Sequence, residues 1–403
     1  MSVISGKKIL LGVTAGIAAY KTAFLVRLFI KAGAQVKVVM TPAAKEFVTP
    51  LTLSTLSKNE VISSFTKEED HSNQWNNHVE LGLWADLMLI APATANTLSK
   101  MAKGHSDNFL LATYLSSKCP VYFAPAMDLD MYRHPSTREN FDTLTSFGNI
   151  MIPATSGELA SGLSGEGRMA EPEDILKFIE DHIAESLPLR NKKVLITAGP
   201  TYEAIDPVRF IGNHSSGKMG FELAAAAQTL GAEVILISGP THLQNPNEEI
   251  NLIRVQSAID MFEAATKFFP EVDIAIASAA VSDYRPKISA TQKIKKSAEN
   301  MVLELVKNPD ILASLGEAKK HQILVGFALE TENEEENAAG KLQRKNLDFI
   351  VLNSLNDSGA GFKSETNKIK ILFKDGKTKG FQLKSKTEVA RDILNEIILL
   401  SNE

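Results

Sequence analysis

The sequence predicts an α/β protein of two domains, each built on a mostly parallel sheet covered by helices. Short apolar runs alternate with helical stretches, as in βαβ units, and the whole pattern restarts half-way along the chain. The length of 403 residues also suits two or three domains at roughly 150 residues each. The apolar runs occupy 7–13, 34–40, 85–92 and 119–126 in the first half, and 192–200, 232–240, 272–281, 322–329 and 347–353 in the second.

The two domains are expected to meet near Pro188. A helical pattern in the polar stretch 180–193 ends at this residue, because proline lacks an amide hydrogen and does not continue a helix. We therefore assign 1–188 to the first domain and 189–403 to the second.

Composition narrows the classes of partner. A formal net charge of -5 and a pI near 6.0 leave no basic footprint for nucleic acid or an anionic membrane, so small molecules are the expected ligands. The single cysteine, Cys119, excludes an internal disulfide and fits a reducing compartment. No apolar run reaches about 18 residues and no signal-peptide pattern precedes the first strand, so the expectation is a cytoplasmic protein without a membrane segment.

Glycines and hydroxyls follow three successive strands of the first half. Because the carboxyl ends of parallel strands share one edge of a sheet, we expect these residues to hold a phosphate or a heteroaromatic group together. The spacing is not that of a dinucleotide fingerprint, so a plain strand-to-helix turn stays open as the reading of the first group. The candidates are Gly12, Thr14, Gly16, Thr41, Thr94 and Asn96.

His78 is expected at the start of a short amphipathic helix on the same edge. Asn76 or Asn77 precedes it as a helix cap. In the first turn the positive end of the helix dipole disfavours the protonated ring, and a neutral imidazole is a competent base. A histidine that merely packs at a helix start is the alternative.

The second half contains a near match to a phosphate-binding loop. The segment "GNHSSGKM" (212–219) has Met219 where such a loop needs a hydroxyl, and it follows its strand by a dozen residues instead of directly. We therefore reject a P-loop, and an Asn/Ser-rich loop with a helix cap stays open as an alternative.

Charged residues of the second half form a candidate triphosphate site. Asp283 follows one apolar strand, and the basic residues Lys293, Lys295 and Lys296 come shortly after it. Asn308 is expected to cap a helix that begins at Pro309. Lys341 and Lys345 are four residues apart on one helix face, where two like charges cost roughly 0.2–0.5 kcal/mol unless an anion joins them. A solvated surface charge is the alternative for any one lysine.

Motifs across the whole chain resemble two known families. The segments "HVELGLWADLMLIAPATANTLSKMAKGHSDNFL", "FAPAMDLDMYRHP" and "SGLSGEGRMAEP" resemble the flavin-dependent cysteine decarboxylases. The segments "TAGPTYEAIDPVRFIGNHSSGKMG", "SAAVSDYRP", "KIKK" and "VKNPDI" resemble phosphopantothenate-cysteine ligase. Together they resemble the bifunctional enzymes of coenzyme A biosynthesis, which implies a flavodoxin-like or Rossmann-like flavoprotein sheet followed by a Rossmann-like ligase sheet.

For the first half, the resemblance implies FMN-dependent decarboxylation of 4′-phospho-N-pantothenoylcysteine to 4′-phosphopantetheine. His78 is the implied base, and Thr14, Thr41 and Thr94 lie along the FMN. The "PAMD" segment, with Ala126 at the cofactor and Asp128 at the substrate, is the implied substrate grip. The family builds each flavin site between neighbouring subunits of a trimer, so homo-oligomerisation is implied.

Two residues depart from the decarboxylase pattern. Asp128 stands where the family has an asparagine that binds the substrate's carboxylate, and Ser161 stands where it has a cysteine acid. A serine hydroxyl is a far poorer acid than a thiol with a reference pKa of about 8.5. Our hypothesis from the sequence is that Asp128, protonated when substrate is bound, supplies the proton that Ser161 does not.

For the second half, the resemblance implies CTP-dependent joining of cysteine to 4′-phosphopantothenate through an acyl cytidylate, with Mg²⁺ on the triphosphate. The implied acyl-transfer residue is Asn213, with Gly217 opening the next helix, and Lys293 balances charge on the reacting phosphate. The implied nucleotide contacts are Asp283, Pro309, Asp310, Ile311, Phe327, Lys341 and Lys345. The sequence indicates no metal ligands. The rival hypotheses are a flavin prenyltransferase or peptidyl-cysteine decarboxylase joined to a nucleotide-binding domain, and a non-catalytic flavoprotein regulatory subunit.

Overall fold

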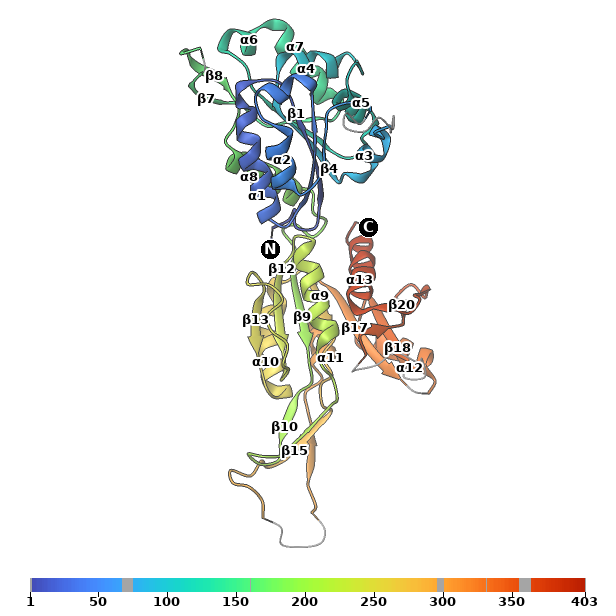
Figure 1. Cartoon of the computed structure of the whole chain (residues 1–403). Coiled ribbons are helices and arrows are strands. Elements are labelled where there is room, and N and C mark those ends of the chain that lie inside the picture. Colours follow the sequence, from blue (N-terminus) through green and yellow to red (C-terminus); the bar gives the residue numbers. More distant parts are fainter. Residues whose placement is uncertain are drawn as a thin grey trace. The chain divides into compact units, whose positions relative to one another are not determined.

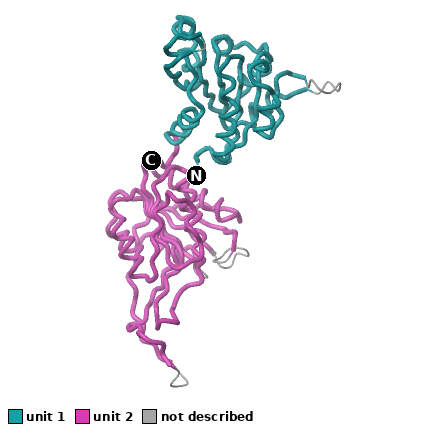
Figure 2. The backbone as a smooth tube through the Cα atoms, turned by 60° about the vertical axis from the view of Figure 1, so that its left-hand side comes forward, with its two compact units in different colours: residues 1–185 teal, residues 186–403 magenta. Residues whose placement is uncertain are grey.

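The chain divides into two compact units, Met1–Glu185 and Ser186–Glu403 (Figure 2). The computed structural model describes residues 2–66, 75–159, 161–295, 301–330, 332–354 and 364–402. The division lies three residues before the boundary expected from Pro188. Each unit has its own sheet and its own apolar core, so each is described by itself.

The first unit is built on a six-stranded parallel sheet in the order β3-β2-β1-β4-β5-β6 (Figure 1). β1 is central, and successive strands are added on one side of it up to β3 and on its other side from β4 onward. This is the strand order of the doubly wound dinucleotide-binding sheets. All four expected strands are present, and the two-residue strands β3 and β6 were not expected. The strands are β1 (Lys8–Val13), β2 (Gln35–Met40), β3 (Val61–Ile62), β4 (Leu87–Ala93), β5 (Val121–Pro125) and β6 (Ile150–Met151).

Helices cover both faces of this sheet because successive strand residues point to opposite sides. Ile9 and Leu11 of β1 pack with residues of α1, α2 and α8, whereas Leu10 packs with α3, α4, α5 and α7. A two-stranded hairpin of β7 (Thr155–Glu158) and β8 (Ser164–Arg168) stands outside the sheet. The helices are η1 (Ile17–Lys21), α1 (Thr22–Lys31), η2 (Pro42–Glu46), α2 (Pro50–Ser57), α3 (His78–Trp84), α4 (Ala95–Ala102), α5 (Phe109–Ser116), α6 (Leu129–Arg133), α7 (Pro135–Ser146) and α8 (Pro172–Glu185).

The second unit repeats the strand order. Its eight-stranded sheet runs β13-β12-β9-β14-β17-β18-β20-β21, with the first six strands parallel and the last two antiparallel. The five expected strands are found, while β13 and the antiparallel pair were not expected. The strands are β9 (Lys193–Ala198), β12 (Glu233–Ser238), β13 (Asn251–Arg254), β14 (Ile274–Ala277), β17 (Ile323–Glu330), β18 (Phe349–Ser354), β20 (Ile369–Phe373) and β21 (Thr378–Gly380).

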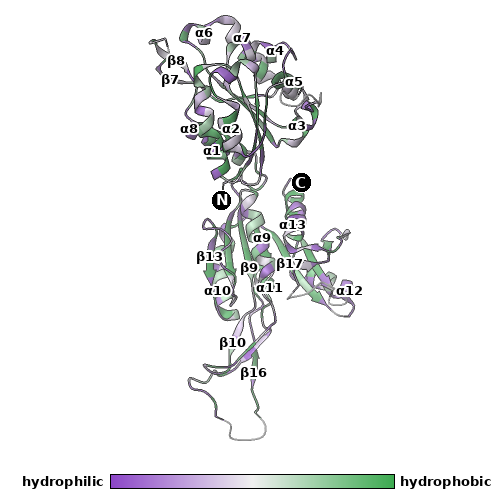
Figure 3. Ribbon diagram, in the orientation of Figure 1, coloured by the Kyte–Doolittle hydropathy of each residue, from purple (hydrophilic) through white to green (hydrophobic). Residues whose placement is uncertain are grey.

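The core of the second unit also lies on both faces of its sheet. Val194 and Ile196 pack with α9 and α13, and Leu195 between them packs with α10, α11 and α12. Figure 3 shows β9 and β17 in the hydrophobic colour, as expected for strands covered on both faces. The helices are α9 (Lys218–Thr229), α10 (Ala258–Phe268), η3 (Phe269–Glu271), α11 (Ile311–Ala318), α12 (Glu334–Arg344) and α13 (Lys386–Ser401).

Three two-stranded ribbons extend from the second unit. The ribbon of β10 (Tyr202–Ala204) and β11 (Phe210–Gly212) contacts the ribbon of β15 (Tyr284–Pro286) and β16 (Leu305–Lys307) (Figure 1). The third ribbon pairs β19 (Thr366–Asn367) with β22 (Lys384–Ser385). Within the described ranges, no helix is both long and apolar enough to cross a membrane.

Candidate functional sites

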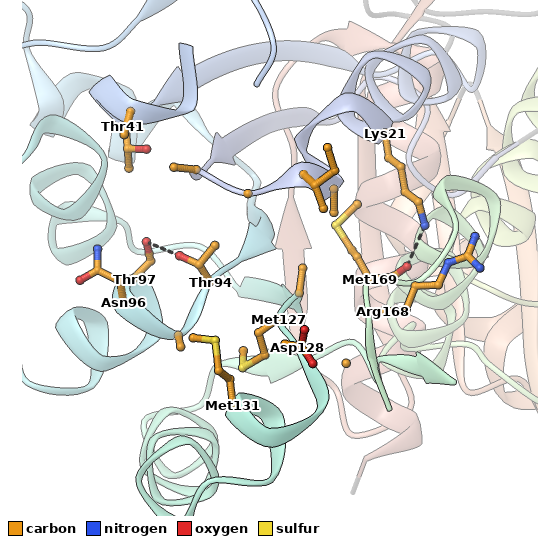
Figure 4. A pocket seen from close by; sticks show the side chains of 18 of the residues that line it. Lys21, Thr41, Thr94, Asn96, Thr97, Met127, Asp128, Met131, Arg168 and Met169 are labelled. Carbon is orange, nitrogen blue, oxygen red and sulfur yellow. Dashed lines mark hydrogen bonds between the residues drawn. The ribbon is translucent and has the colours of Figure 1, made fainter. Parts of the chain in front are cut away.

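A cavity of about 920 Å³ opens at the carboxyl edge of the first sheet (Figure 4). Four short helices begin at its wall, with N-cap residues Gly16, Thr41, Thr94 and Asp128. The first amides of a helix have no partner inside the helix, so these starts direct hydrogen-bond donors toward the cavity. The chain's order of strands places them together, as the sequence predicted for Gly16, Thr41, Thr94 and Asn96.

Thr41 brings a polar side-chain atom to the cavity wall. Its hydroxyl oxygen is buried and has no hydrogen-bond partner among the described residues. Thr94 is hydrogen-bonded already, because its hydroxyl donates to Thr97 Oγ1 at 3.3 Å, and Thr14 Oγ1 lies 3.4 Å from it. Leaving a buried hydroxyl unsatisfied costs free energy, so the Thr41 position fits a bound polar group.

Gly12 and Thr14 support the wall without lining the cavity, in contrast to the sequence expectation. Gly12 lies under α5, where a Cβ would stand 2.7 Å from Ile90 Cδ1 and 3.1 Å from Leu110 Cδ1. Thr14 is fully buried and donates to the carbonyl of Pro92 at 2.6 Å. Close packing of strand and helix therefore accounts for Gly12, and positioning of Thr94 accounts for Thr14.

Three cations line the same cavity, and each is paired with a carboxylate of this chain. Lys21 is 4 % exposed, donates to Met169 O at 3.0 Å and pairs with Glu171 at 2.9 Å. Arg168 pairs with the same carboxylate at 2.8 Å, and Lys100 pairs with Asp107 at 2.5 Å. The hydrogen bond from Lys21 lowers the pKa of Glu171, and the one from Lys100 lowers the pKa of Asp107. The pair of Lys21 and Glu171 was not found from the sequence, because 150 residues separate the two side chains.

Asp128 lines the cavity beside Met127 and Met131 (Figure 4). Its Oδ1 accepts the amide hydrogen of Leu129 at 2.6 Å as the cap of α6. The hairpin holds this segment, since Met127 donates to Gly167 O at 3.0 Å and a Cβ on Gly167 would stand 2.3 Å from Met127 O. Gly167 has φ +133, which favours glycine.

Ser161 does not reach this cavity. It is exposed at the tip of the β7–β8 hairpin, where its hydroxyl accepts from Leu163 N–H at 3.4 Å. Glu158 and Leu159 of the same hairpin do line the cavity. The two positions that depart from the decarboxylase pattern thus differ in placement, and Ser161 is not assembled with the other site residues.

His78 begins α3, as the sequence predicted, and Asn77 is the cap, accepting from Val79 and Glu80 at 3.1 Å each. The ring lies edge-on to Phe65, Trp75 and Phe109, at centroid distances of 6.0 to 6.3 Å. Its Nδ1 is buried and has no partner in the part of the chain that the structure describes. His78 is not among the residues lining its own unit's cavity.

A second cavity, of about 550 Å³, lies at the carboxyl edge of the second sheet. It is bounded by Thr197 at the end of β9, by the residues after β14 and by the start of α11, at the point where the strand order reverses. Seven of the eight residues that the resemblance implied at the nucleotide line it, and Lys293 does not: the seven are Asp283, Pro309, Asp310, Ile311, Phe327, Lys341 and Lys345.

Two of the three lysines that line this cavity, Lys341 and Lys345, have different partners. Lys345 pairs with Asp310 at 2.8 Å, while Lys341 donates to the carbonyl of Phe327 at 2.9 Å. Burial, together with the neighbouring Lys345, lowers the pKa of Lys341. Burial alone would raise the pKa of Asp310, but the hydrogen bonds from Lys345 and Ala313 outweigh it and the pKa is lowered. An anion entering the cavity relieves the repulsion between the lysines.

The cap expected at Asn308 is wrong. Asp310 caps α11, which begins at Ile311, and its side chain accepts from Ala313 N–H at 3.0 Å. The Asn308 side chain instead donates to Ser282 O at 2.7 Å and accepts from Arg285 at 3.1 Å. These contacts join the β15–β16 ribbon to the segment that follows β14. Because they engage the Asn308 side chain, the cap of α11 is Asp310.

Asn213 and Lys293 lie outside the second cavity's lining. Asn213 Nδ2 donates to the carbonyls of Ala280 and Val281, at 3.1 and 3.2 Å, and so holds the segment after β14. Gly217 caps α9 with φ +80, as expected. Lys293 is exposed on a segment anchored by Ile294, whose N–H donates to Asp206 at 3.2 Å. Lys296 lies outside the described residues.

The strand order and the two edge cavities define a class of protein, two doubly wound α/β units in tandem, each with a cavity at the carboxyl edge of its sheet. Family models agree: residues 2–184 match "Flavoprotein", and residues 189–400 match "DNA/pantothenate metabolism flavoprotein C-terminal domain". The coenzyme A biosynthesis bifunctional protein CoaBC of Bacillus subtilis strain 168 is 48% identical over 402 residues, covering 99% of this chain and 98% of that protein. The chain belongs to the CoaBC family.

Other matches cover most of the chain or one of its halves. A "Cysteine/Cysteine sulfinic acid decarboxylase" from an unknown prokaryotic organism is 55% identical over 359 residues, covering 88% of this chain and 99% of that protein. A crystal structure of the C-terminal domain of CoaBC is 46% identical with a TM-score of 0.47, covering 54% of this chain and 99% of that one. A PPC decarboxylase mutant complexed with pantothenoylaminoethenethiol is 34% identical with a TM-score of 0.40, covering 45% and 100%.

Proposed function

We propose that the chain catalyses two steps of coenzyme A biosynthesis: CTP-dependent ligation of cysteine to 4′-phosphopantothenate, then FMN-dependent decarboxylation of the product to 4′-phosphopantetheine. One observation carries the proposal. Two cavities at equivalent edges of two like sheets collect the hydroxyl-rich residues in one unit and the lysine pair in the other. Relatives named CoaBC cover nearly the whole chain, which supports the pairing of these activities.

The first cavity fits FMN. Its volume lies within the roughly 300–1,000 Å³ range of cofactor sites, and the helix starts capped by Gly16 and Thr94 suit a phosphate or a polar ring edge. The unsatisfied hydroxyl of Thr41 is a polar atom that such a group would satisfy. When bound, FMN would supply redox chemistry: it would accept electrons from the cysteinyl group, which allows the carboxylate to leave as CO₂, and it would return them afterwards. Asn96 and Ala126 complete the wall that holds it.

His78 would reach such a site from a neighbouring copy of the chain. Around the cavity mouth, η1, α1 and α2 expose Ile17, Tyr20, Phe24 and Leu51, with side chains 51 to 75 % exposed. A second apolar face, beside His78, exposes Trp75, Val79, Leu83 and Leu115. Two different exposed faces on one unit suit a head-to-tail ring, in agreement with the trimer that the resemblance implies. In such a ring the imidazole takes a proton from the substrate bound next door.

The second cavity would bind CTP through Lys341 and Lys345. Phosphopantothenate's carboxylate oxygen attacks the α-phosphorus of CTP and pyrophosphate leaves. The amine of cysteine then displaces CMP. Mg²⁺ would accompany the triphosphate, since Mg²⁺ usually binds through few protein ligands. Consistently, the described residues contain no group of three His, Cys, Asp or Glu side chains able to hold a metal ion.

Mass spectrometry of the products tests both steps together. Purified protein is incubated with 4′-phosphopantothenate, cysteine, CTP and Mg²⁺. The proposal predicts CMP, pyrophosphate and 4′-phosphopantetheine, and a yellow protein. Accumulation of 4′-phospho-N-pantothenoylcysteine would retain the ligase and reject the decarboxylase, and a protein that takes up no FMN would reject the flavin site.

A second candidate for the first half is decarboxylation of cysteine itself. The relative named for cysteine and cysteine sulfinic acid is 55% identical and shares most of the chain's length, which favours this candidate. Supplying L-cysteine without phosphopantothenate or CTP and measuring CO₂ release tests it directly.

A further inference from the structure

The basic and the acidic side chains that line the first cavity differ in whether they have ion-pair partners. Its three cationic side chains are each engaged by a carboxylate of the chain, Lys21 and Arg168 by Glu171 and Lys100 by Asp107. Asp128 and Glu158 also line the cavity, and no ion pair joins either to a cation among the described residues. The cavity therefore presents more negative than positive charge to a ligand.

Asp128 is held firmly in this cavity. One oxygen accepts the Leu129 amide at 2.6 Å, and the hairpin hydrogen bond from Met127 to Gly167 holds the preceding residue. Oδ2 accepts no hydrogen bond from the described residues. With one oxygen bound and the other open to the cavity, the carboxylate is oriented to accept from a ligand donor (Figure 4).

We propose that Asp128 is a specificity-determining residue that binds the α-ammonium of a free amino acid, so that this cavity accepts cysteine-like zwitterions as substrates. The proposal rests on the flavoprotein decarboxylase function proposed above. 4′-Phospho-N-pantothenoylcysteine carries a carboxylate and a phosphate but no cation, because its nitrogen is acylated. Free cysteine carries an ammonium, which forms a charge-assisted hydrogen bond with the open oxygen of Asp128.

The net reaction balances without a further reagent. The bond between the α-carbon and the carboxylate breaks, CO₂ leaves, and a proton takes its place on carbon, so cysteine and a proton give cysteamine and CO₂. The substrate's sulfur and nitrogen keep their oxidation states. Asp128 acts only by positioning the ammonium and with it the bonds that react.

Binding of product-like amines tests the proposal apart from turnover. Calorimetry compares cysteamine with N-acetylcysteamine on the FMN-loaded full-length protein. We expect cysteamine to bind at least tenfold tighter, and Asp128→Asn to abolish the difference. Asparagine caps helices as well as aspartate does, so α6 should persist. The matched control is Asp130→Asn, an exposed acidic residue in the first turn of the same helix, which should keep the difference.

Turnover provides the second measurement. The ratio of kcat/KM for L-cysteine to that for 4′-phospho-N-pantothenoylcysteine should fall at least tenfold in Asp128→Asn. If instead Asp128 is the acid, Asp128→Asn leaves unreduced enethiol from the acylated substrate, and Ser161→Cys added to it restores saturated thiol; that result overturns ammonium binding. Equal binding of cysteamine and N-acetylcysteamine to the parent protein also overturns it. Absence of FMN uptake is a separate outcome, and it rejects the proposed flavin site itself.

Discussion

The two units share a strand order yet differ in how their edge cavities treat charge. In the first, every lining cation is paired with a carboxylate of the chain, with Lys21 and Arg168 sharing Glu171, and helix starts with threonine hydroxyls supply the donors. In the second, Lys341 is partly buried and has no carboxylate partner in the described residues, and it lies four positions from a second lysine. The comparison teaches that the parallel sheet decides where a ligand binds, whereas side chains on the flanking helices decide which charge it carries.

The largest expected effect is a loss of decarboxylation in the first unit without a change in ligation by the second. His78→Asn should lower decarboxylation by about 10²- to 10⁴-fold, the usual contribution of a general base. FMN absorbance and ligation should be unchanged, because the ring does not line its own unit's cavity. Steady-state rates and absorbance spectra check this, with exposed His105→Asn as control. Full decarboxylase activity in the variant would remove His78 from the mechanism.

The corresponding change in the second unit is Lys293→Gln. Loss of one transition-state charge contact costs about 3 kcal/mol, or roughly a hundredfold in ligation rate. Decarboxylation of supplied 4′-phospho-N-pantothenoylcysteine should continue at the parent rate.

Lys293 is exposed and outside the cavity lining, so the measurement decides whether its segment moves to the nucleotide. Lys295→Gln, two residues further on, is the control. If both variants release pyrophosphate at the rate of the parent protein, Lys293 is a surface charge.

Lys341, which is partly buried in the second cavity, should make CTP binding sensitive to pH. Burial lowers the Lys341 pKa below its usual 10.5, so the amine loses its charge at a lower pH than an exposed lysine does. CTP affinity should therefore be full at neutral pH and fall as pH rises through the lowered pKa. Lys341→Met should remove this fall and weaken binding about 10- to 100-fold, since hydrogen bonds to charged groups contribute roughly 1.5–3 kcal/mol.

Calorimetric CTP titrations from pH 7 to 10 measure this dependence. Lys370→Met, which removes a surface ion pair with Glu335 on the same α12, should keep the parent profile. An affinity that rises with pH would contradict the assignment.

The smallest expected effect distinguishes a ligand-facing hydroxyl from a structural one. Thr41→Val should weaken FMN binding by roughly tenfold or less, since a neutral hydrogen bond contributes about 0.5–1.5 kcal/mol. It should not lower the free energy of unfolding of the FMN-free protein, because the hydroxyl has no partner there. Thr14→Val should lower that free energy by removing the hydrogen bond to Pro92.

Urea unfolding and FMN titration separate the two variants. Equal loss of stability in both would show that Thr41 has a structural partner.

Much of the fold followed from local patterns. Strands buried on both faces must be short apolar runs, so β1, β4, β9 and β17 were predictable from composition alone. The hydroxyls of Thr41 and Thr94 were predictable as edge residues because each follows such a strand directly. Asn77 and His78 were predictable as a cap and a first helical residue because capping acts within a few residues of chain.

Contacts between distant segments were not predictable in this way. Gly12 reads as part of a phosphate loop, but its role is set by Leu110 on α5. Lys21 drew no prediction from the sequence, and it is buried against Met169 and Glu171. Asn308 precedes a proline as caps often do, but Ser282 and Arg285 engage its side chain.

The sequence by itself therefore determined the class of fold, the edge of each sheet where the cavities lie and most of the residue types found there. Only the tertiary structure decided which charges stay available to a ligand. Periodicity and capping are properties of neighbouring residues, whereas the neutralisation of a charge depends on which carboxylate folding brings within hydrogen-bond distance. Glu171 takes up the charge of Lys21 from 150 residues away, and no comparable partner reaches Asp128 in the described chain.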